Sequence, residues 1–292
     1  ACALALCLTV CLFAGTASAA AREPISKFTI PLADNVNLIE MTHAGGIFTD
    51  PKDVLQQHAL TYQPGGDVQP MVIYGSTLYG RSTMSKIATY LDNQNLSLVA
   101  GVNGSFFDMS TGIPYGLIVT DGVLRTSGNV NSVGFFKNGS AIIASPDLHV
   151  LLTGGAFSDT EIFYNKVLTT TNGIGLYSRD YDTATKNTVS AYNLVLKPVS
   201  GSDSELTLSG EMTLEVTKIT QSAASCAIPA GGFVLSIAEQ TSYASVLTNM
   251  KAFKVGDRVT ISVRCADEWA DVAYACGGGD LLRSEEHTSE LQ

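Results

Sequence analysis

Residues Val99 to Ser127, VAGVNGSFFDMSTGIPYGLIVTDGVLRTS, carry the polar and aromatic side chains whose spacing best suits chemistry. An apolar run leads into Asn103 and Gly104. A second apolar run follows after about a dozen residues, whereas an ordinary hairpin uses two. Long ordered loops on a strand scaffold are where binding and catalytic residues concentrate. The amide of Asn103 and the carboxylate of Asp108 therefore predict a loop that binds a polar ligand.

The two polar side chains each have a functional and a structural interpretation. The amide of Asn103 both donates and accepts, so it can orient a sugar hydroxyl or a phosphate oxygen. The alternative is an Asx turn, in which the side chain bonds its own loop. Asp108 is the nearest carboxylate, a candidate acid, base or hydrogen-bond acceptor, and its alternative is a solvated loop cap. Glycoside cleavage commonly uses two carboxyl groups, and Asp121, in an Asp-Gly turn, is read as structural.

The aromatic residues of the loop add a surface for a ligand. Phe106 and Phe107 are adjacent, so they cannot both point to one face of a strand. We expect one to anchor the core and the other to stack beneath a sugar ring, with core packing of both as the alternative. Tyr115 is either a hydroxyl in the site or a packed side chain. The remaining loop residues are expected to shape the backbone for close approach of a ligand: Gly104, Gly112, Pro114 and Gly116.

The surrounding elements predict an α+β fold with a strand-rich, mixed or antiparallel sheet core and few helices. Leu98 to Val102 reads as a buried strand that ends at Asn103. Alternating patterns predict further strands, over residues 36–40, 189–199, 206–219 and 258–265. A helix is expected from a cap at Ser82 or Thr83 to Asp92-Asn93, and a second one over 241–250. The segment 201–250 is a candidate for a small inserted β subdomain.

The same residues resemble the core motif of the phosphodiester glycosidase family, in its secreted bacterial branch. Family members read "NG-(small or Asp)-FF" and then "TG-x-P-x-G". The matching positions are Asn103, Gly104, Ser105, Phe106 and Phe107, followed by Thr111, Gly112, Pro114 and Gly116. Further similar segments are VGFFKNGSA (133–141), IPAGGFVL (228–235) and KVGDRV (254–259). The resemblance spans residues 25–282.

The resemblance implies a secreted hydrolase that cleaves a sugar phosphodiester or a related envelope glycan. A lysosomal member of the family removes N-acetylglucosamine from a phosphodiester-linked sugar. Asn103 and Asp108 would be catalytic, and a phosphate leaving group, which departs without full protonation, lowers the need for a second acid. The substrate-binding positions would be Gly104, Ser105, Phe106, Phe107, Thr111, Gly112, Tyr115 and Gly116. Family members often carry Asp or Gly at the position of Ser105. This difference argues against a catalytic role for Ser105.

Two other classes of function stay open. One is a non-catalytic extracellular glycan-binding or cell-surface module, which Ser105 and the missing second carboxylate favour. The other is a structural protein of a cell wall or spore coat. The family's Arg-Thr-Ala-Ile-Gly-like and Asp-Gly-Gly-Gly-Ser-like motifs would fall after Leu282, so we expect this chain by itself to be inactive.

Both ends of the chain differ from the rest. Residues 1–19 are apolar and uncharged and end in Ala-Ser-Ala, as a secretory signal peptide does; a single membrane anchor is the alternative. Residues 283–292, RSEEHTSELQ, resemble a translated sequencing adapter, with a genuine polar tail as the alternative. The glycosidase-like domain would then occupy 20–282, and the mature protein would be extracellular or at the cell surface, with no membrane insertion.

The composition limits the classes of binding partner that the protein is expected to have. The formal net charge is −10, which argues against nucleic acid and anionic membranes and leaves a carbohydrate or sugar phosphate. Of six cysteines, three fall within residues 1–19. Cys226 and Cys265 could form a disulfide, but we favour buried free thiols for these two and Cys276. No metal-binding, phosphate-loop or GxSxG pattern is present, so no metal or cofactor is expected.

Overall fold

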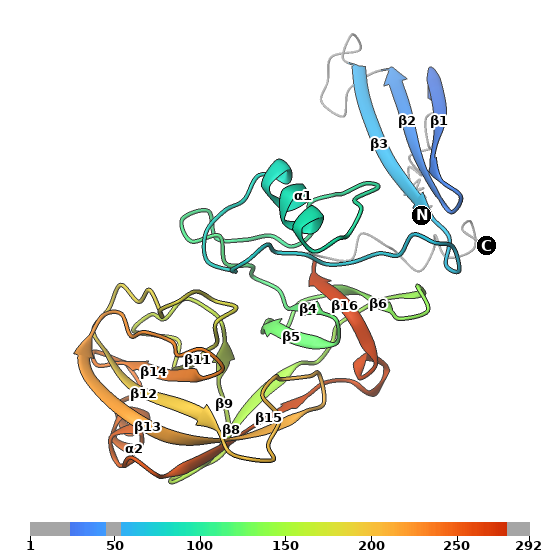
Figure 1. Ribbon diagram of the computed structural model, residues 1–292. Helices are drawn as coiled ribbons and strands as arrows, with labels where there is room; N and C mark the ends of the chain where they lie inside the picture. Colours follow the sequence, from blue (N-terminus) through green and yellow to red (C-terminus); the bar gives the residue numbers. More distant parts are fainter. Residues whose placement is uncertain (1–23, 45–53, 279–292) are drawn as a thin grey trace, which may run out of the picture. The chain divides into compact units, whose positions relative to one another are not determined.

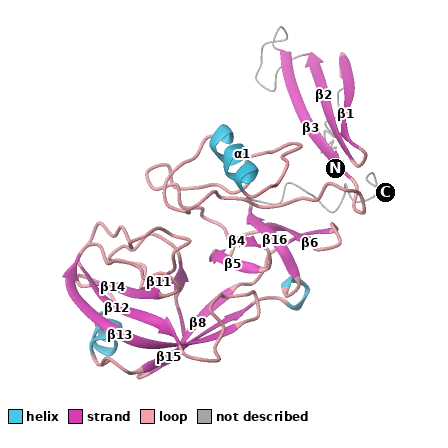
Figure 2. Ribbon diagram, in the orientation of Figure 1, coloured by secondary structure: helices cyan, strands magenta, loops and turns pink. Residues whose placement is uncertain are grey.

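The computed structural model describes residues 24–44 and 54–278, and the chain divides into two compact units, residues 1–62 and 63–292. The predicted signal peptide (1–19) and the adapter-like tail (283–292) lie outside the described residues. Strands and loops predominate over helices in both ribbon views (Figures 1 and 2). The fold is α+β and mostly β, as predicted.

The first unit is a three-stranded antiparallel sheet in the order β1-β2-β3. Its strands are β1 (Ser26–Ala33), β2 (Val36–Ala44) and β3 (Val54–Tyr62). The alternation over residues 36–40 correctly predicts the start of β2. Val36 is buried at the turn between β1 and β2.

The second unit is built on an eight-stranded sheet in the order β10-β11-β14-β12-β13-β15-β8-β9. Its strands are β8 (His149–Gly154), β9 (Phe157–Glu161), β10 (Phe163–Tyr164), β11 (Ile174–Tyr177), β12 (Ala191–Pro198), β13 (Glu211–Ala223), β14 (Phe233–Ala238) and β15 (Arg258–Arg264). In the described chain, β10 and β11 pair in parallel and the other neighbouring strands of this sheet pair antiparallel. The sheet is therefore mixed. β12 and β13 run side by side through its middle (Figure 1).

The burial of β15 and β14 follows their sequence patterns, whereas β12, predicted from alternation to have one buried face, is buried at its first four residues. β15 alternates buried with partly exposed positions, as a strand with one covered face does. Every residue of β14, FVLSIA, is buried, because a continuous apolar run suits a strand covered on both faces. The strands of segment 201–250 pair with β12, β11 and β15, which lie outside that segment, so they share the large sheet.

A five-stranded sheet in the order β5-β4-β16-β6-β7 belongs to the same unit. Its strands are β4 (Ile118–Thr120), β5 (Val123–Thr126), β6 (Ser132–Phe136), β7 (Ala141–Ala144) and β16 (Val272–Gly277). The short 3-10 helix η1 (Asp267–Trp269) precedes β16 and buries Trp269 completely. Gly134 in β6 leaves room for that ring, since an added Cβ would lie 2.9 Å from it.

Both predicted helices form. α1 spans Met84–Asn93, and Thr83 caps it by accepting a hydrogen bond from Lys86 N at 3.3 Å. α2 spans Ala244–Lys251. Among the described residues, no helix is long and apolar enough to span a membrane.

The predicted buried strand at Leu98–Val102 is wrong. These residues form no strand, and Leu98, Val99 and Val102 are 43%, 36% and 74% exposed. A strand requires a neighbour whose N–H and C=O groups pair with its own, and no described strand pairs with this segment. The apolar pattern alone could not supply that neighbour.

Candidate functional site

The loop of residues 103–116 is a narrow, hairpin-like excursion that returns to β4. Phe107 and Pro114 form an isolated antiparallel bridge. On either side, Tyr115 N donates to Phe106 O at 2.9 Å, and Asp108 N donates to Ile113 O at 2.9 Å. The backbone of the predicted site is therefore held by its own cross-links.

Asp108 closes the tip of this loop. Its Oδ1 accepts hydrogen bonds from the backbone and hydroxyl groups of both Ser110 and Thr111, at 2.5–3.0 Å. The bond from the Ser110 hydroxyl, followed by those from Thr111, lowers the pKa of Asp108 to about 2. The carboxylate is therefore ionised at neutral pH, which suits a hydrogen-bond acceptor, while so low a pKa makes it a weak base and no proton donor. The hydrogen bonds accepted by Oδ1 therefore agree with the interpretation of Asp108 as a loop cap.

Asn103 and Ser105 lie at the start of the loop. Asn103 is exposed, and its amide makes no hydrogen bond within the described chain, so the Asx turn is not formed. The Ser105 hydroxyl donates to Phe106 O at 3.1 Å. The amide of Asn103 is free to meet a ligand, and its catalytic role stays a prediction.

The aromatic residues of the loop face outward. Phe106 and Tyr115 are 69% and 60% exposed, and Phe107 is 40% exposed. The prediction that one phenylalanine anchors the core is wrong, because both side chains are exposed and neither belongs to a buried cluster. The loop thus presents aromatic side chains to solvent on a constrained backbone.

Gly112 and Gly116 allow close approach of other backbone segments of the protein. Gly112 has φ +79°, and an added Cβ would overlap the carbonyl oxygen of Gly80, whose N–H donates to Thr111 O at 2.7 Å. At Gly116 a Cβ would overlap Gly277 at the end of β16. The expected close approach at both glycines is therefore made by another chain segment. Gly104 lies beside Cys276, with its ideal Cβ position 3.1 Å from Sγ.

Lys166 fixes the far side of the loop, and no sequence motif indicated it. Its Nζ donates to the carbonyl oxygens of Pro114, Tyr115 and Gly116 at 2.5, 3.1 and 3.1 Å. An ammonium has three N–H donors, so its donors match the three acceptors one to one. Burial lowers the pKa of Lys166 to about 7, so the three-donor ammonium form predominates below this pH. The amine thus links the end of β10 to the turn that carries Tyr115.

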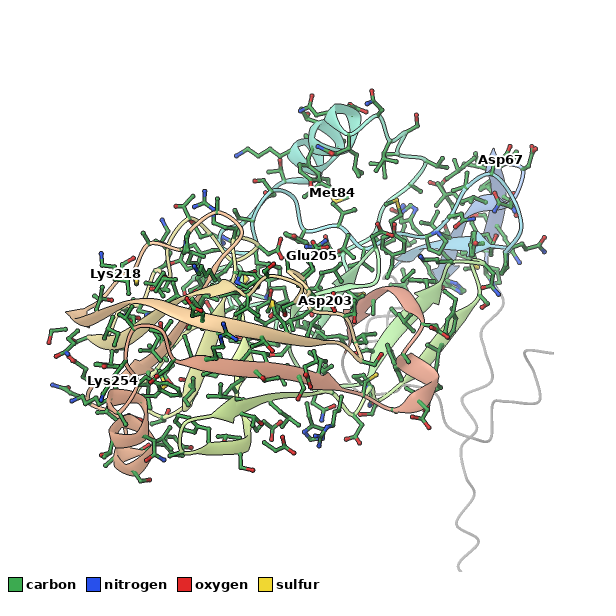
Figure 3. The ribbon with its side chains drawn as sticks, turned by 60° about the horizontal axis from the view of Figure 1, so that its bottom comes forward. Asp67, Met84, Asp203, Glu205, Lys218 and Lys254 are labelled. Carbon is green, nitrogen blue, oxygen red and sulfur yellow. The ribbon has the colours of Figure 1, made fainter. Side chains whose placement is uncertain are left out.

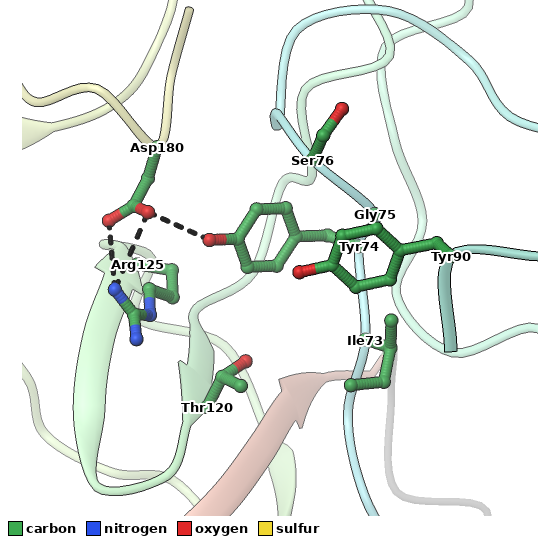
Figure 4. A pocket seen from close by; sticks show the side chains of 8 residues that line it. All are labelled: Ile73, Tyr74, Gly75, Ser76, Tyr90, Thr120, Arg125 and Asp180. Carbon is green, nitrogen blue, oxygen red and sulfur yellow. Dashed lines mark hydrogen bonds and ion pairs between the residues drawn. The ribbon is translucent and has the colours of Figure 1, made fainter. Parts of the chain in front are cut away.

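A separate polar pocket of about 250 Å³ opens in the same unit (Figure 4). At its centre, Arg125 Nη1 lies 3.2 Å from Asp180 Oδ2, and the Tyr74 hydroxyl donates to Asp180 Oδ1 at 2.8 Å. Burial, and next the Asp180 carboxylate, raise the pKa of Tyr74 well above its usual value, so this hydroxyl stays a donor. The other lining residues are Ile73, Gly75, Ser76, Tyr90 and Thr120.

None of the predicted site residues lines that pocket. The structure brings Gly104 and Gly116 to the end of β16 and Thr111 to Gly80, whereas Asn103 and Asp108 stay on the exposed loop. Arg125 could have been singled out as the one charged residue in β5, VLRT, but its partner is 55 residues away. Only the fold reveals that pairing.

The described cysteines are free thiols. Cys226 is buried, and Cys265 and Cys276 are partly buried. All three are thus free, as preferred, but only Cys226 is buried as expected. Burial raises the pKa of Cys276, which keeps it protonated beside Gly104.

Comparisons with known proteins concern the fold alone. No family model and no curated protein matches the chain. A crystal structure of a "hypothetical protein" from Synechocystis is similar, with a TM-score of 0.64 and 14% identity over 89% of this chain and 45% of that one. A "Putative exported protein" from Burkholderia pseudomallei K96243 has a TM-score of 0.47 and 16% identity, over 84% of this chain and 49% of that one. The chain thus spans less than half the length of either structure.

Proposed function

We propose that this chain is part of an extracellular hydrolase that cleaves a sugar phosphodiester or a related envelope glycan, with the sugar bound at loop 103–116. One observation carries the proposal: a single cross-linked loop presents the exposed aromatic rings of Phe106 and Tyr115 and the unengaged amide of Asn103. An apolar ring with adjacent polar groups matches the face and the hydroxyls of a sugar. The signal-like residues 1–19 support an extracellular location.

The chemistry assigns a specific part to Asp108. Glycosyl transfer passes through a transition state with positive charge on the sugar ring. An ionised carboxylate with a pKa of about 2 can stabilise that charge, but it is a weak base and cannot protonate a leaving group. A phosphate leaves as a stable anion without such protonation. The ionised Asp108 therefore favours a phosphodiester over an ordinary glycoside as substrate.

A second candidate is a non-catalytic glycan-binding module. It is favoured by the fact that Asp108 Oδ1 is engaged by Ser110 and Thr111, while the loop itself supplies no other carboxylate. In this case the aromatic residues bind a glycan and no bond is cleaved.

A paired measurement separates the two candidates. The methyl phosphodiester of N-acetylglucosamine 1-phosphate is tested for binding to this chain and for turnover by the longer protein that contains it. For a hydrolase, Asp108→Ala and Asn103→Ala each lower turnover by roughly 100-fold or more, with smaller effects on binding. Asp203→Ala, at an exposed acid between β12 and β13, is the matched control. Binding without turnover in the unmodified longer protein supports the module, and the absence of both refutes the proposal.

A further inference from the structure

The pocket around Arg125 and Asp180 has hydrogen-bonding groups that the protein itself does not use. Arg125 contacts Asp180 and Glu205 through Nη1, while its Nε is buried without a partner in the described chain. A buried donor left unpaired loses its hydration without a compensating hydrogen bond, so its presence calls for an explanation. Nε and Nη2 form one edge of the guanidinium fork, which can donate two parallel hydrogen bonds.

The charges of the pocket select against an anionic ligand. Arg125 is neutralised by Asp180 at 3.2 Å, and Glu205 lies 3.5 Å from the same nitrogen. Glu205 and Asp203 lie together in the connection that follows β12 (Figure 3). An anion bound to the Arg125 guanidinium would meet two carboxylates that the single cation does not balance. A ligand without net charge avoids this repulsion.

The lining residues complete a surface for hydroxyl groups and a ring. A hydroxyl can accept from Arg125 and donate to Asp180, which no purely donating or accepting group can do. Ser76 and Tyr90 add hydroxyls, and Tyr90 also brings an aromatic ring from α1. The side chains of Arg125 and Asp180 are 17% and 24% exposed, so both are within reach of a solute. The volume of about 250 Å³ corresponds to roughly eight water molecules.

We propose that this pocket is a second, neutral saccharide site, in which Arg125 and Asp180 hydrogen-bond adjacent hydroxyls of one sugar ring and Tyr90 packs against it. The site shares no lining residue with loop 103–116. The inference does not rest on the proposed function, because it follows from the pocket's own groups.

The test follows the Arg125 Nε–H and Gly75 amide signals by NMR while the chain is titrated with three methyl glycosides, of glucose, galactose and N-acetylglucosamine, and separately with inorganic phosphate. At least one glycoside is expected to shift both signals in the millimolar range, and phosphate is expected to shift neither. Tyr90→Ala should weaken glycoside binding about fivefold or more, and Arg125→Lys about tenfold or more. Tyr243→Ala, at an exposed tyrosine that precedes α2, is the matched control and should change nothing.

Two results would overturn the inference. One is that no glycoside shifts the Arg125 signal, whether or not phosphate does. The other is that glycoside binding survives Tyr90→Ala and Ser76→Ala unchanged. Both of these substitutions lie outside the buried ion pair, so they keep the test valid if Arg125→Lys fails to fold. Tyr115→Ala separates the two sites: if it alone removes binding, the loop proposal stands and this inference fails.

Discussion

At the scale of single residues, the predicted site loop is defined by hydrogen bonds that satisfy its own backbone. Asp108 accepts four hydrogen bonds at one oxygen, two of them from backbone N–H groups, and Lys166 donates three to carbonyl oxygens of the opposite turn. A site built in this way has a fixed backbone before any ligand arrives, which lowers the ordering cost of binding.

The pH dependence of the loop is expected to follow Asp108. Because hydrogen bonds lower its pKa from 3.8 to about 2 in the folded protein, the carboxylate stabilises the fold above its unfolded pKa. This contribution is lost as the pH falls from about 4 through about 2. Amide exchange at Ser110 and Thr111 should therefore accelerate over that range. Asp108→Asn should remove this transition, Asp203→Asn should leave it, and an unchanged transition in Asp108→Asn would contradict the assignment.

Gly112 provides a second residue-scale prediction. Gly112→Ala places a side chain at φ +79° and into the carbonyl of Gly80. Gly122, with φ +75° and nothing within 4 Å of an added Cβ, is a matched control for the backbone strain alone. Urea unfolding should show a loss of about 1–2 kcal/mol for Gly122→Ala and about 1–3 kcal/mol more for Gly112→Ala. Equal losses would mean that the loop moves freely away from Gly80.

At the scale of elements, α1 is a helix with a good N-terminal cap and little burial. Leu91 is its single buried residue, and Met84 is 46% exposed. Short helices in water depend mainly on packing of an apolar face. Its cap therefore accounts for a larger share of its stability than a cap does in a buried helix.

The sequence left Ser82 and Thr83 as alternative caps, and the structure selects Thr83. Thr83→Ala should lower helix stability by about 0.5–1 kcal/mol, because Lys86 N loses its acceptor. Ser82→Ala is the neighbouring control and should have less effect. Hydrogen exchange of the Lys86 and Ile87 amides measures the difference. A larger effect at Ser82 would place the cap one residue earlier.

At the scale of the whole molecule, the chain consists of two compact units that meet in sequence at residues 62 and 63. The sequence that follows, QPGGD, combines Pro, Gly and Asp, which favour turns and linkers. Boundaries between compact units commonly fall in such exposed segments.

Limited proteolysis tests this boundary. A protease that cuts before aspartate should cleave native protein at Asp67 earlier than at Asp180, which is bonded to Arg125 and Tyr74. Mass spectrometry of the early products should show a fragment that begins at Asp67. Asp67→Asn should abolish this cut without affecting others. Early cleavage within the eight-stranded sheet would contradict the division into these units.

The sequence by itself determined the elements whose pattern is local. The alternation over 189–199 and 258–265 predicts β12 and β15, and the cap and apolar stripe near Thr83 predict α1. These predictions succeed because periodicity and capping depend on residues a few positions apart.

Only the tertiary structure decided what lies next to the candidate site. An apolar run at Leu98–Val102 has the composition of a strand but lacks a strand partner in the described chain. Lys166 reaches carbonyls about 50 residues earlier, and Arg125 meets Asp180 from another part of the fold. Such pairings are set by which backbone segments approach one another. No local pattern encodes that approach, because it depends on the packing of the entire unit.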